Sequence, residues 1–353
     1  MNCMKTLFRI LIVLFCIAIV YYYTSDSTYE LEPLEGPNSN SSVIPKTEIP
    51  KGDEDALPRP KTGISTYINQ KSERIVKDFG EPNRIDQSAY GYEWWVYNND
   101  PKSFIMFGVE NGKVTQVYTA GSQVDATPYK IGESIDEIYR MTIVNPEITV
   151  NIGDNVYTFS LSEYDMHSRI LVKFDDVFAQ LYIDQFTDTL VGIRYMNGET
   201  LVKHRPYEMT FVGDLIRVPN LNSYILQQSN EAYSKQLFDI VNVFRKNKDV
   251  PTLEWDVEAS LAAMEHSEEM YTEDYLSHDS PKFGSLKDRL QMHSVVYDEV
   301  GENLATAYYD AIEAAHGWFN SEEHRDLILN EKFTHVGSGV FLNYYTQIFL
   351  NKP

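Results

Sequence analysis

Apolar residues recur at helical spacing in the last third of the chain. Two faces with this spacing predict amphipathic helices. The first face consists of Leu237, Ile240, Val241 and Phe244, and the second of Val257, Leu261, Met264 and Tyr271. Shorter helices are predicted over residues 286–292, 310–318 and 322–329. The chain then closes with two runs that predict antiparallel strands, Val336–Leu342 and Tyr345–Leu350.

The middle of the chain alternates apolar and polar residues instead, which is typical of half-buried strands. Six such runs are Tyr92–Tyr97, Phe104–Val109, Lys113–Tyr118, Ile170–Phe174, Phe178–Ile183 and Leu190–Tyr195. Equivalent apolar positions in the two groups of three, such as Val96 and Val172, lie 76 residues apart. The pattern predicts a duplication of a helix-plus-antiparallel-sheet unit, with the strand-like runs 147–150 and 156–161 inserted in the second copy. One continuous β-rich domain is the alternative.

The N-terminus has the pattern of a membrane segment. Lys5 and Arg9 accompany an apolar run of about 17 residues that ends at Tyr23, which is just enough to cross a bilayer. The leading basic residues would keep the N-terminus inside and place the rest of the chain at the extracellular face. The run ends in three tyrosines without the small residues of a cleavage site, so a single-pass anchor is favoured over a cleaved signal segment and a secreted protein.

These patterns divide the chain into four parts. Residues 1–23 are predicted to be a membrane anchor or signal segment, and residues 24–61 a disordered linker rich in Ser, Asn, Pro and acidic residues. A β-rich domain is predicted over residues 62–215 and a second domain over residues 225–353.

Charge and cysteine content narrow the possible functions. The formal net charge of −22 repels phosphate backbones, so we expect no nucleic-acid partner. Cationic partners and divalent ions remain compatible with this charge. Both cysteines, Cys3 and Cys16, lie in or beside the anchor, so the extracellular part can form no internal disulfide and has no thiol nucleophile. It has no Gly-x-Ser-x-Gly elbow either.

The candidate chemistry lies in the last domain, where two histidines and several acids recur within short motifs. His278, Glu302 and His324 make up a ligand set that suits a transition metal with an open water position. The same residue types serve general acid and base catalysis. The residues alone leave both uses open, and each of the three could also be a capping or turn residue.

These residues belong to an ordered series of motifs that resembles the CAP/SCP superfamily of cysteine-rich secretory, antigen 5 and pathogenesis-related 1 proteins, most closely its bacterial branch. The series is Leu253-Glu254-Trp255-Asp256, Ser277-His278, Asp288-Arg289-Leu290, Gly301-Glu302-Asn303-Leu304-Ala305, Trp318-Phe319-Asn320-Ser321, His324-Arg325 and Phe333-Thr334-His335-Val336-Gly337. The resemblance covers about residues 231–350, and the β-rich segment before it resembles the CAP-associated N-terminal domain of some bacterial members.

The resemblance implies an α+β fold, with a C-terminal α-β-α sandwich of the CAP type after a β-rich α+β domain built from a duplication. It also implies a cleft with a tetrad of two histidines and two acidic residues. His278 and His324 match the histidines, Glu302 matches one acid, and Glu322 or Glu323 lies where the other should be. A divalent metal, zinc, copper or calcium, would be held by the first three. The chain departs from the family pattern at Ser294, Leu327 and Tyr345, which affects packing and cleft shape more than the tetrad.

Two functions are compatible with these motifs, and the resemblance permits a third, lipid transport, which no feature of the sequence specifically supports. The favoured one is an envelope binding or interaction module, in which the cleft binds a divalent metal or a ligand and the partner is an envelope protein, a peptide or a small ligand. The alternative is a metal-dependent, peptidase-like hydrolase of envelope peptides or cell-wall material, in which Glu302 takes a proton from metal-bound water. The sequence assigns no catalytic residue, and we favour a binding function over an enzymatic one.

Overall fold

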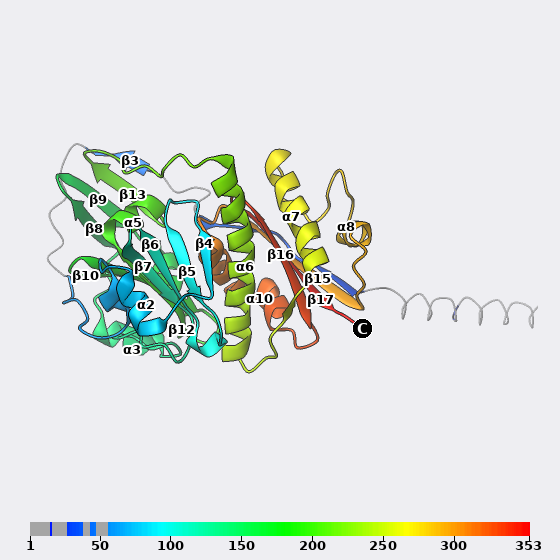
Figure 1. Ribbon diagram of the computed structural model, residues 1–353, viewed down its shortest axis with the longest axis horizontal. Helices are drawn as coiled ribbons and strands as arrows, with labels where there is room; N and C mark the ends of the chain where they lie inside the picture. Colours follow the sequence, from blue (N-terminus) through cyan, green and yellow to red (C-terminus); the bar gives the residue numbers. More distant parts are fainter. Residues whose placement is uncertain (1–14, 16–26, 38–42, 47–55) are drawn as a thin grey trace, which may run out of the picture.

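The computed structural model of the chain describes residue 15 and residues 27–37, 43–46 and 56–353. Figure 1 shows two β-sheet regions on either side of the long helix α6 (Ser223–Asn247). The helix contacts strands of both regions, so it lies between them and packs against each. The fold is α+β, as predicted.

A seven-stranded antiparallel sheet dominates the N-terminal region. Its strands are β10 (Arg169–Phe174), β11 (Val177–Asp184), β12 (Thr189–Asn197), β7 (Lys113–Thr119), β6 (Ile105–Glu110), β5 (Glu93–Tyr97) and β4 (Arg84–Gln87), in that spatial order. The six predicted strand runs are all present. The strands of the two predicted copies form one sheet, because β12 pairs with β7 through Ile193 and Thr119.

The two faces of this sheet pack against different partners, because successive side chains of a strand point to opposite sides. Phe107 faces a core under the short helices η2 (Ile64–Tyr67), α2 (Glu73–Phe79) and α3 (Ile135–Met141). Its neighbour Met106 faces the other way and shares a core with α6 and the C-terminal domain. The sheet is therefore buried on both sides.

The strand-like runs inserted in the second copy form a small sheet of their own. Its strands, in the order β3-β13-β9-β8, are β3 (Val43–Pro45), β13 (Glu208–Val212), β9 (Asn155–Ser160) and β8 (Glu147–Ile152), and α4 (Glu163–Ser168) and α5 (Gly198–His204) lie nearby. β3 falls inside the predicted disordered linker, residues 24–61. Backbone pairing with the edge of β13 orders this segment, and Val43 packs against the core of the small sheet.

The C-terminal region is the predicted α-β-α sandwich. Its mixed sheet has the order β1-β15-β17-β16-β14, and β2 also pairs with β15. The strands are β1 (Ser27–Glu30), β2 (Leu34–Glu35), β14 (Glu254–Trp255), β15 (Glu299–Thr306), β16 (His335–Phe341) and β17 (Tyr344–Asn351). Helices α7 (Val257–Thr272) and α8 (Leu286–Met292) cover one face. Helices α6, α9 (Ala311–Phe319) and α10 (Glu322–Leu329) cover the other.

The buried face of α7 differs from the one predicted. Val257 and Leu261 are more than half exposed, and Tyr271 is 43% exposed. Alanines and Met270 form the buried face instead. The helix lies very close to the sheet, since a Cβ on Gly339 would overlap the backbone nitrogen of Met264. Only small side chains fit at so close an approach, so residue size overrides hydrophobicity here.

A cluster of buried ion pairs joins the two domains. Arg194 of β12 donates to Asp310 at 2.6 Å, and Arg169 of β10 donates to Glu313 of α9 at 2.7 Å. The hydroxyl of Tyr309 accepts a further hydrogen bond from Arg194 at 2.6 Å. We call Arg194, Asp310, Arg169 and Glu313 the interdomain cluster. Because protein groups from both domains surround it, the domains are tied together by polar as well as apolar contacts.

The predicted anchor, residues 1–23, lies outside the described residues apart from Phe15. Within the part of the chain that the structure describes, none of the helices has both the length and the apolar character needed to cross a bilayer.

Candidate functional site

Three elements bring the predicted histidines and glutamate together. His278 lies in the loop between α7 and α8, Glu302 on β15, and His324 on the first turns of α10. All three side chains are buried, with 8%, 0% and 2% of the residue exposed, respectively. The charge of His278 influences the pKa of His324, which places the two rings in one electrostatic environment. The structure therefore brings the three side chains together in a buried place, and their role as a ligand site stays a prediction.

Glu302 is the centre of the site and is fully paired. Arg289 of α8 donates Nη1–H to Oε1 and Nη2–H to Oε2, both at 2.9 Å. His278 donates Nδ1–H to Oε2 at 2.8 Å. Burial alone would raise the pKa of Glu302, but the charge of Arg289 and the bond from His278 hold it well below its usual range. Glu302 is thus a carboxylate at every physiological pH.

The two ring nitrogens of His278 both meet acceptors. Nδ1 faces the Glu302 carboxylate, and Nε2 faces the backbone carbonyl of Leu31 in a close hydrogen bond. Neither acceptor can donate, so a ring that satisfies both carries a proton on each nitrogen. The bond from Arg289 to the His278 carbonyl, at 2.9 Å, fixes the backbone of the same residue. This arrangement orients Nε2 of His278 toward the backbone carbonyl of Leu31.

His324 is the neutral member of the pair. Its Nδ1 hydrogen-bonds with the Ser321 hydroxyl at 2.8 Å, and its carbonyl accepts from Asn303 of β15 at 3.2 Å. Burial, and then the charge of His278, lowers its pKa to about 4, while the backbone of Glu32 acts in the opposite direction. At neutral pH the ring of His324 therefore stays uncharged.

Sequence reasoning missed two members of the site. Arg289 shares the buried face of α8 with Leu286 and Leu290, and a charged residue on an apolar helical face was the signal that could have identified it. His266 of α7 is fully buried and donates to the Ser277 carbonyl at 3.0 Å. Burial lowers its pKa to about 4, and the charge of Glu302 acts in the opposite direction. It supports the loop that carries His278.

Glu322 and Glu323 occupy a different environment. Both lie nearer the solvent in the first turn of α10, whereas the other three predicted residues are buried. The Glu302 carboxylate forms its ion pair with the guanidinium of Arg289. A place for Glu322 or Glu323 in the ligand site remains a prediction.

A metal ion fits this set of side chains poorly. In the described ranges, no group of three or more His, Cys, Asp or Glu side chains has an arrangement that could hold an ion. The reason at this site is chemical, because both oxygens of Glu302 already accept from cations and Nδ1 of His278 points at the same carboxylate. A divalent ion would have to displace Arg289 or sit beside its positive charge.

A segment from the N-terminal side of the chain covers the site. Residues 27–36, which we call the strap, run parallel to β15 as β1 and β2. The amide of Gly36 extends this pairing with a bond of 2.8 Å to the Thr306 carbonyl. Between the two short strands, Leu31 and Glu32 pass over His278 and His324. The strap also lies within the predicted disordered linker, residues 24–61, and the structure differs from the prediction there.

Sequence comparisons agree with this architecture. The profile of the cysteine-rich secretory protein family (CAP) matches residues 238–349, and that of the CAP-associated N-terminal domain matches residues 68–207. A Bacillus subtilis (strain 168) protein, YlbC, described as an uncharacterized membrane protein, is 37% identical over 349 residues, which is 99% of this chain and 100% of the relative. The chain belongs to the cysteine-rich secretory protein family.

Two solved structures resemble this CAP protein over most of its length. An extracellular protein with an SCP domain from Bacillus anthracis str. Ames is 40% identical, with a TM-score of 0.79 over 86% of this chain and 100% of that one. A cysteine-rich secretory protein from Staphylococcus aureus is 26% identical, with a TM-score of 0.76 over 92% of this chain and 99% of that one. The predicted family and fold class are therefore confirmed.

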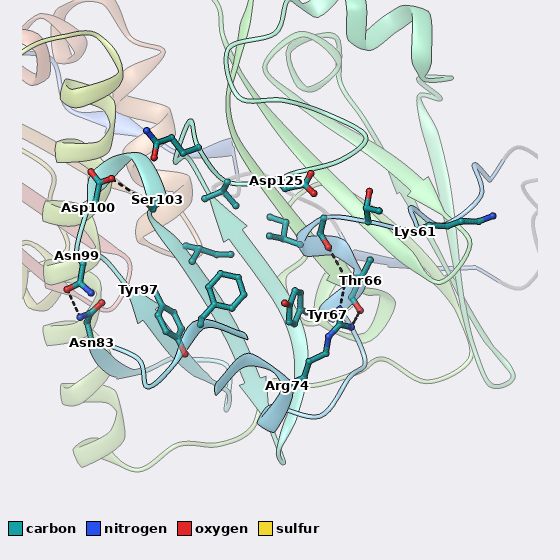
Figure 2. A pocket seen from close by; sticks show the side chains of 17 residues that line it. Lys61, Thr66, Tyr67, Arg74, Asn83, Tyr97, Asn99, Asp100, Ser103 and Asp125 are labelled. Atoms are coloured by element: carbon teal, nitrogen blue, oxygen red, sulfur yellow. Dashed lines mark hydrogen bonds between the residues drawn. The ribbon is translucent and has the colours of Figure 1, made fainter. Parts of the chain in front are cut away.

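Two hollows lie away from the covered site of this CAP protein. One, of about 570 Å³, lies beside η2, α2 and β5 in the N-terminal domain (Figure 2). Two of its charged groups have partners: Arg74 lies 4.2 Å from the Tyr67 ring centre, and Asp100 accepts from Ser103. The other, of about 730 Å³, is apolar and lies between α6 and α7, where Trp255 and Leu261 line it. Neither contains a predicted site residue.

Proposed function

We propose that this chain is a membrane-tethered extracellular binding module, and that its CAP domain holds a ligand above His278, Glu302 and His324. The observation that carries the proposal is the pairing of Glu302 with Arg289. A carboxylate with both oxygens bonded to a guanidinium is a weak base and a good anchor. Its role here is to orient His278 so that Nε2–H points out of the site as a donor. Such a donor recognises a carbonyl group.

The location rests on three lines of support. One relative is described as a membrane protein and one similar structure as an extracellular protein. Near its start the sequence has Lys5, Arg9 and an apolar run of about 17 residues, the pattern of an anchor that leaves the rest of the chain outside. A cysteine-free body and a charge of −22 suit a soluble domain at the envelope.

A metal-dependent hydrolase is the less favoured function. It requires a general base with a pKa near the working pH, and the pKa of Glu302 lies well below that range. It also requires a metal in a site where Arg289 already neutralises the carboxylate. For these reasons binding ranks above catalysis.

The test uses the full chain in lipid nanodiscs and a pool of acetylated ten-residue peptides of random sequence. Retained peptides are identified by mass spectrometry for the wild type, for His278→Ala and for the matched control His293→Ala, whose ring pairs with Glu265 outside the site. We expect wild type and control to retain uncut peptides at least fivefold over His278→Ala. Equal retention by all three proteins, or peptides cut in the presence of zinc, would contradict the proposal.

A further inference from the structure

We infer that the site together with the edge of β15 is a groove for an extended, carbonyl-presenting polypeptide strand, and that the strap is its displaceable occupant in cis. The inference rests on the proposed function and deepens it by naming the class of ligand and a competitor for it. Its basis is the way in which residues 27–36 are held against β15.

The strap is held by its backbone. β1 and β2 both pair with β15 and form an edge of the six-stranded sheet. Glu32 and Glu35 are exposed, while Leu31 and Leu34 are partly buried and add packing against the main hydrophobic core. Main-chain bonds to an open strand edge, with few side-chain requirements, are the mode by which many domains add a peptide strand to a sheet. The groove therefore selects an extended backbone more than a particular sequence.

The register shows why the site reads a carbonyl. Glu30 pairs with Glu302 and Leu34 with Ala305, so the strap has one residue more than β15 between these two pairs. An extra residue makes a strand bulge, and the bulge leaves backbone groups unpaired. One of these, the Leu31 carbonyl, accepts from His278. Pro33 lies in the bulge, where its lack of an amide proton removes one donor that would need a partner.

The hydrogen-bonding groups favour a strand that presents an acceptor. His278 has an acceptor at each ring nitrogen, the Glu302 carboxylate and the Leu31 carbonyl, and Arg289 offsets the charge of Glu302. A backbone carbonyl therefore fits the place that the Leu31 carbonyl now occupies.

Nothing covalent locks the strap in place, since both cysteines of the chain lie at positions 3 and 16. An edge strand with mostly main-chain contacts belongs to the low-stability end of a protein and opens without global unfolding. A strand in trans would then compete with the strap, and its apparent affinity would be reduced by the fraction of molecules in which the groove is open.

The decisive measurement is binding of a fluorescein-labelled peptide with the sequence of residues 27–37, followed by fluorescence polarisation. Gly36→Val is the opening variant, because a Cβ at this position would lie 2.7 Å from the Ala307 carbonyl oxygen and 2.9 Å from the Tyr308 ring. The matched control on the same strap is Glu35→Ala, which alters an exposed side chain. A third protein lacks residues 27–36, so that the result does not depend on how far valine lifts the strap.

We expect Gly36→Val and the deletion to bind the peptide at least tenfold more tightly than the wild type and Glu35→Ala, with the deletion protein folded by circular dichroism. His324 gives a second readout by NMR, since opening exposes the ring and raises its pKa from about 4. Equal peptide affinity in wild type and deletion overturns the inference, and so does no binding to the folded deletion protein. If the random pool is still retained through His278 in these cases, the proposed function stands and only the cis competitor fails.

Discussion

The strap-covered site and the interdomain cluster are both built on a buried arginine–carboxylate pair, yet they differ in what surrounds the pair. Around Arg194 and Asp310 the remaining hydrogen bonds stay inside the two packed domains and involve the Tyr309 hydroxyl and the Glu313 amide. Around Arg289 and Glu302 one outward donor, on His278, reaches a backbone carbonyl of an edge strand. A buried charge pair is thus common to both places and does not by itself indicate a binding site. The site differs because His278 donates to a backbone carbonyl of the strap, which another strand could replace.

The interdomain cluster should give the largest effect on stability. Arg194→Met leaves the buried Asp310 without its cation, and we expect the free energy of unfolding to fall by about 3–5 kcal/mol. Urea unfolding followed by tryptophan fluorescence measures the loss. Lys332→Met, which removes a largely exposed partner of Glu299, is the control and should cost less than about 1 kcal/mol. A loss below about 1 kcal/mol for Arg194→Met would mean that the cluster is hydrated.

The same substitution at the site should cost less stability and change the chemistry. Arg289→Met removes the guanidinium from both oxygens of Glu302, but the hydrogen bond from His278 to Oε2 remains, so we expect a loss of about 2–3 kcal/mol. With the guanidinium gone, Glu302 and His278 become available to a cation. We expect calorimetry to show zinc binding at least tenfold tighter than in the wild type.

The zinc result separates this expectation from the predicted metal site of His278, Glu302 and His324. Adding His278→Ala and His324→Ala to Arg289→Met should abolish the new zinc affinity. Tight zinc binding by the wild type, lost in Arg289→Met, would reverse our view and favour the metal-dependent function.

Acidification should weaken the site through its histidines before it reaches its glutamate. The pKa of His324 is about 4 in the folded chain, below the ordinary value of 6.5, so the unfolded chain binds more protons between these values. Stability is therefore lost as pH falls from about 6.5 toward 4, by about 1–3 kcal/mol for this group. The folded pKa of Glu302 is depressed, so the stability that it contributes is fully present above its unfolded pKa of about 4.5 and is lost only below that pH.

Urea unfolding at pH 7, 5.5 and 4.5 measures this dependence. His324→Gln should lose part of it, while His293→Gln, at a partly exposed surface position, should keep it. An unchanged pH profile in His324→Gln would show that this ring is not the titrating group. His266 acts in the same direction, since burial also lowers its pKa to about 4. Burial likewise lowers the pKa values of His204 and His316, so these three rings account for the rest of the dependence.

The sequence was sufficient for the parts of the fold that have a periodic apolar pattern. The alternating runs became the strands of the large sheet, and the spacing of Leu237 and Phe244 became the buried face of α6. β15 was not predicted as a strand, since its residues were considered only as a motif. The strap could not be predicted, because docking through the backbone leaves no pattern of side chains. Arg289 as the partner of Glu302 depends on where α8 packs, which no local pattern gives.

The smallest expected effect concerns the strap itself and tests whether it opens alone. Leu34→Ala removes part of a half-buried side chain, so it should destabilise strap docking by about 1 kcal/mol and leave global unfolding nearly unchanged. In amide hydrogen exchange, the Gly36 amide, which is bonded to Thr306 at 2.8 Å, should then exchange about five- to tenfold faster. Ile44→Ala, an exposed apolar residue on β3, is the matched control and should have no effect there.

The amide of Gln347 in the central strand β17 reports global unfolding. If Gly36 exchanged as slowly as Gln347 in the wild type, the strap would open only when the whole domain unfolds. The site would then be as inaccessible to a second strand as the interdomain cluster is, and the difference between the two regions would disappear.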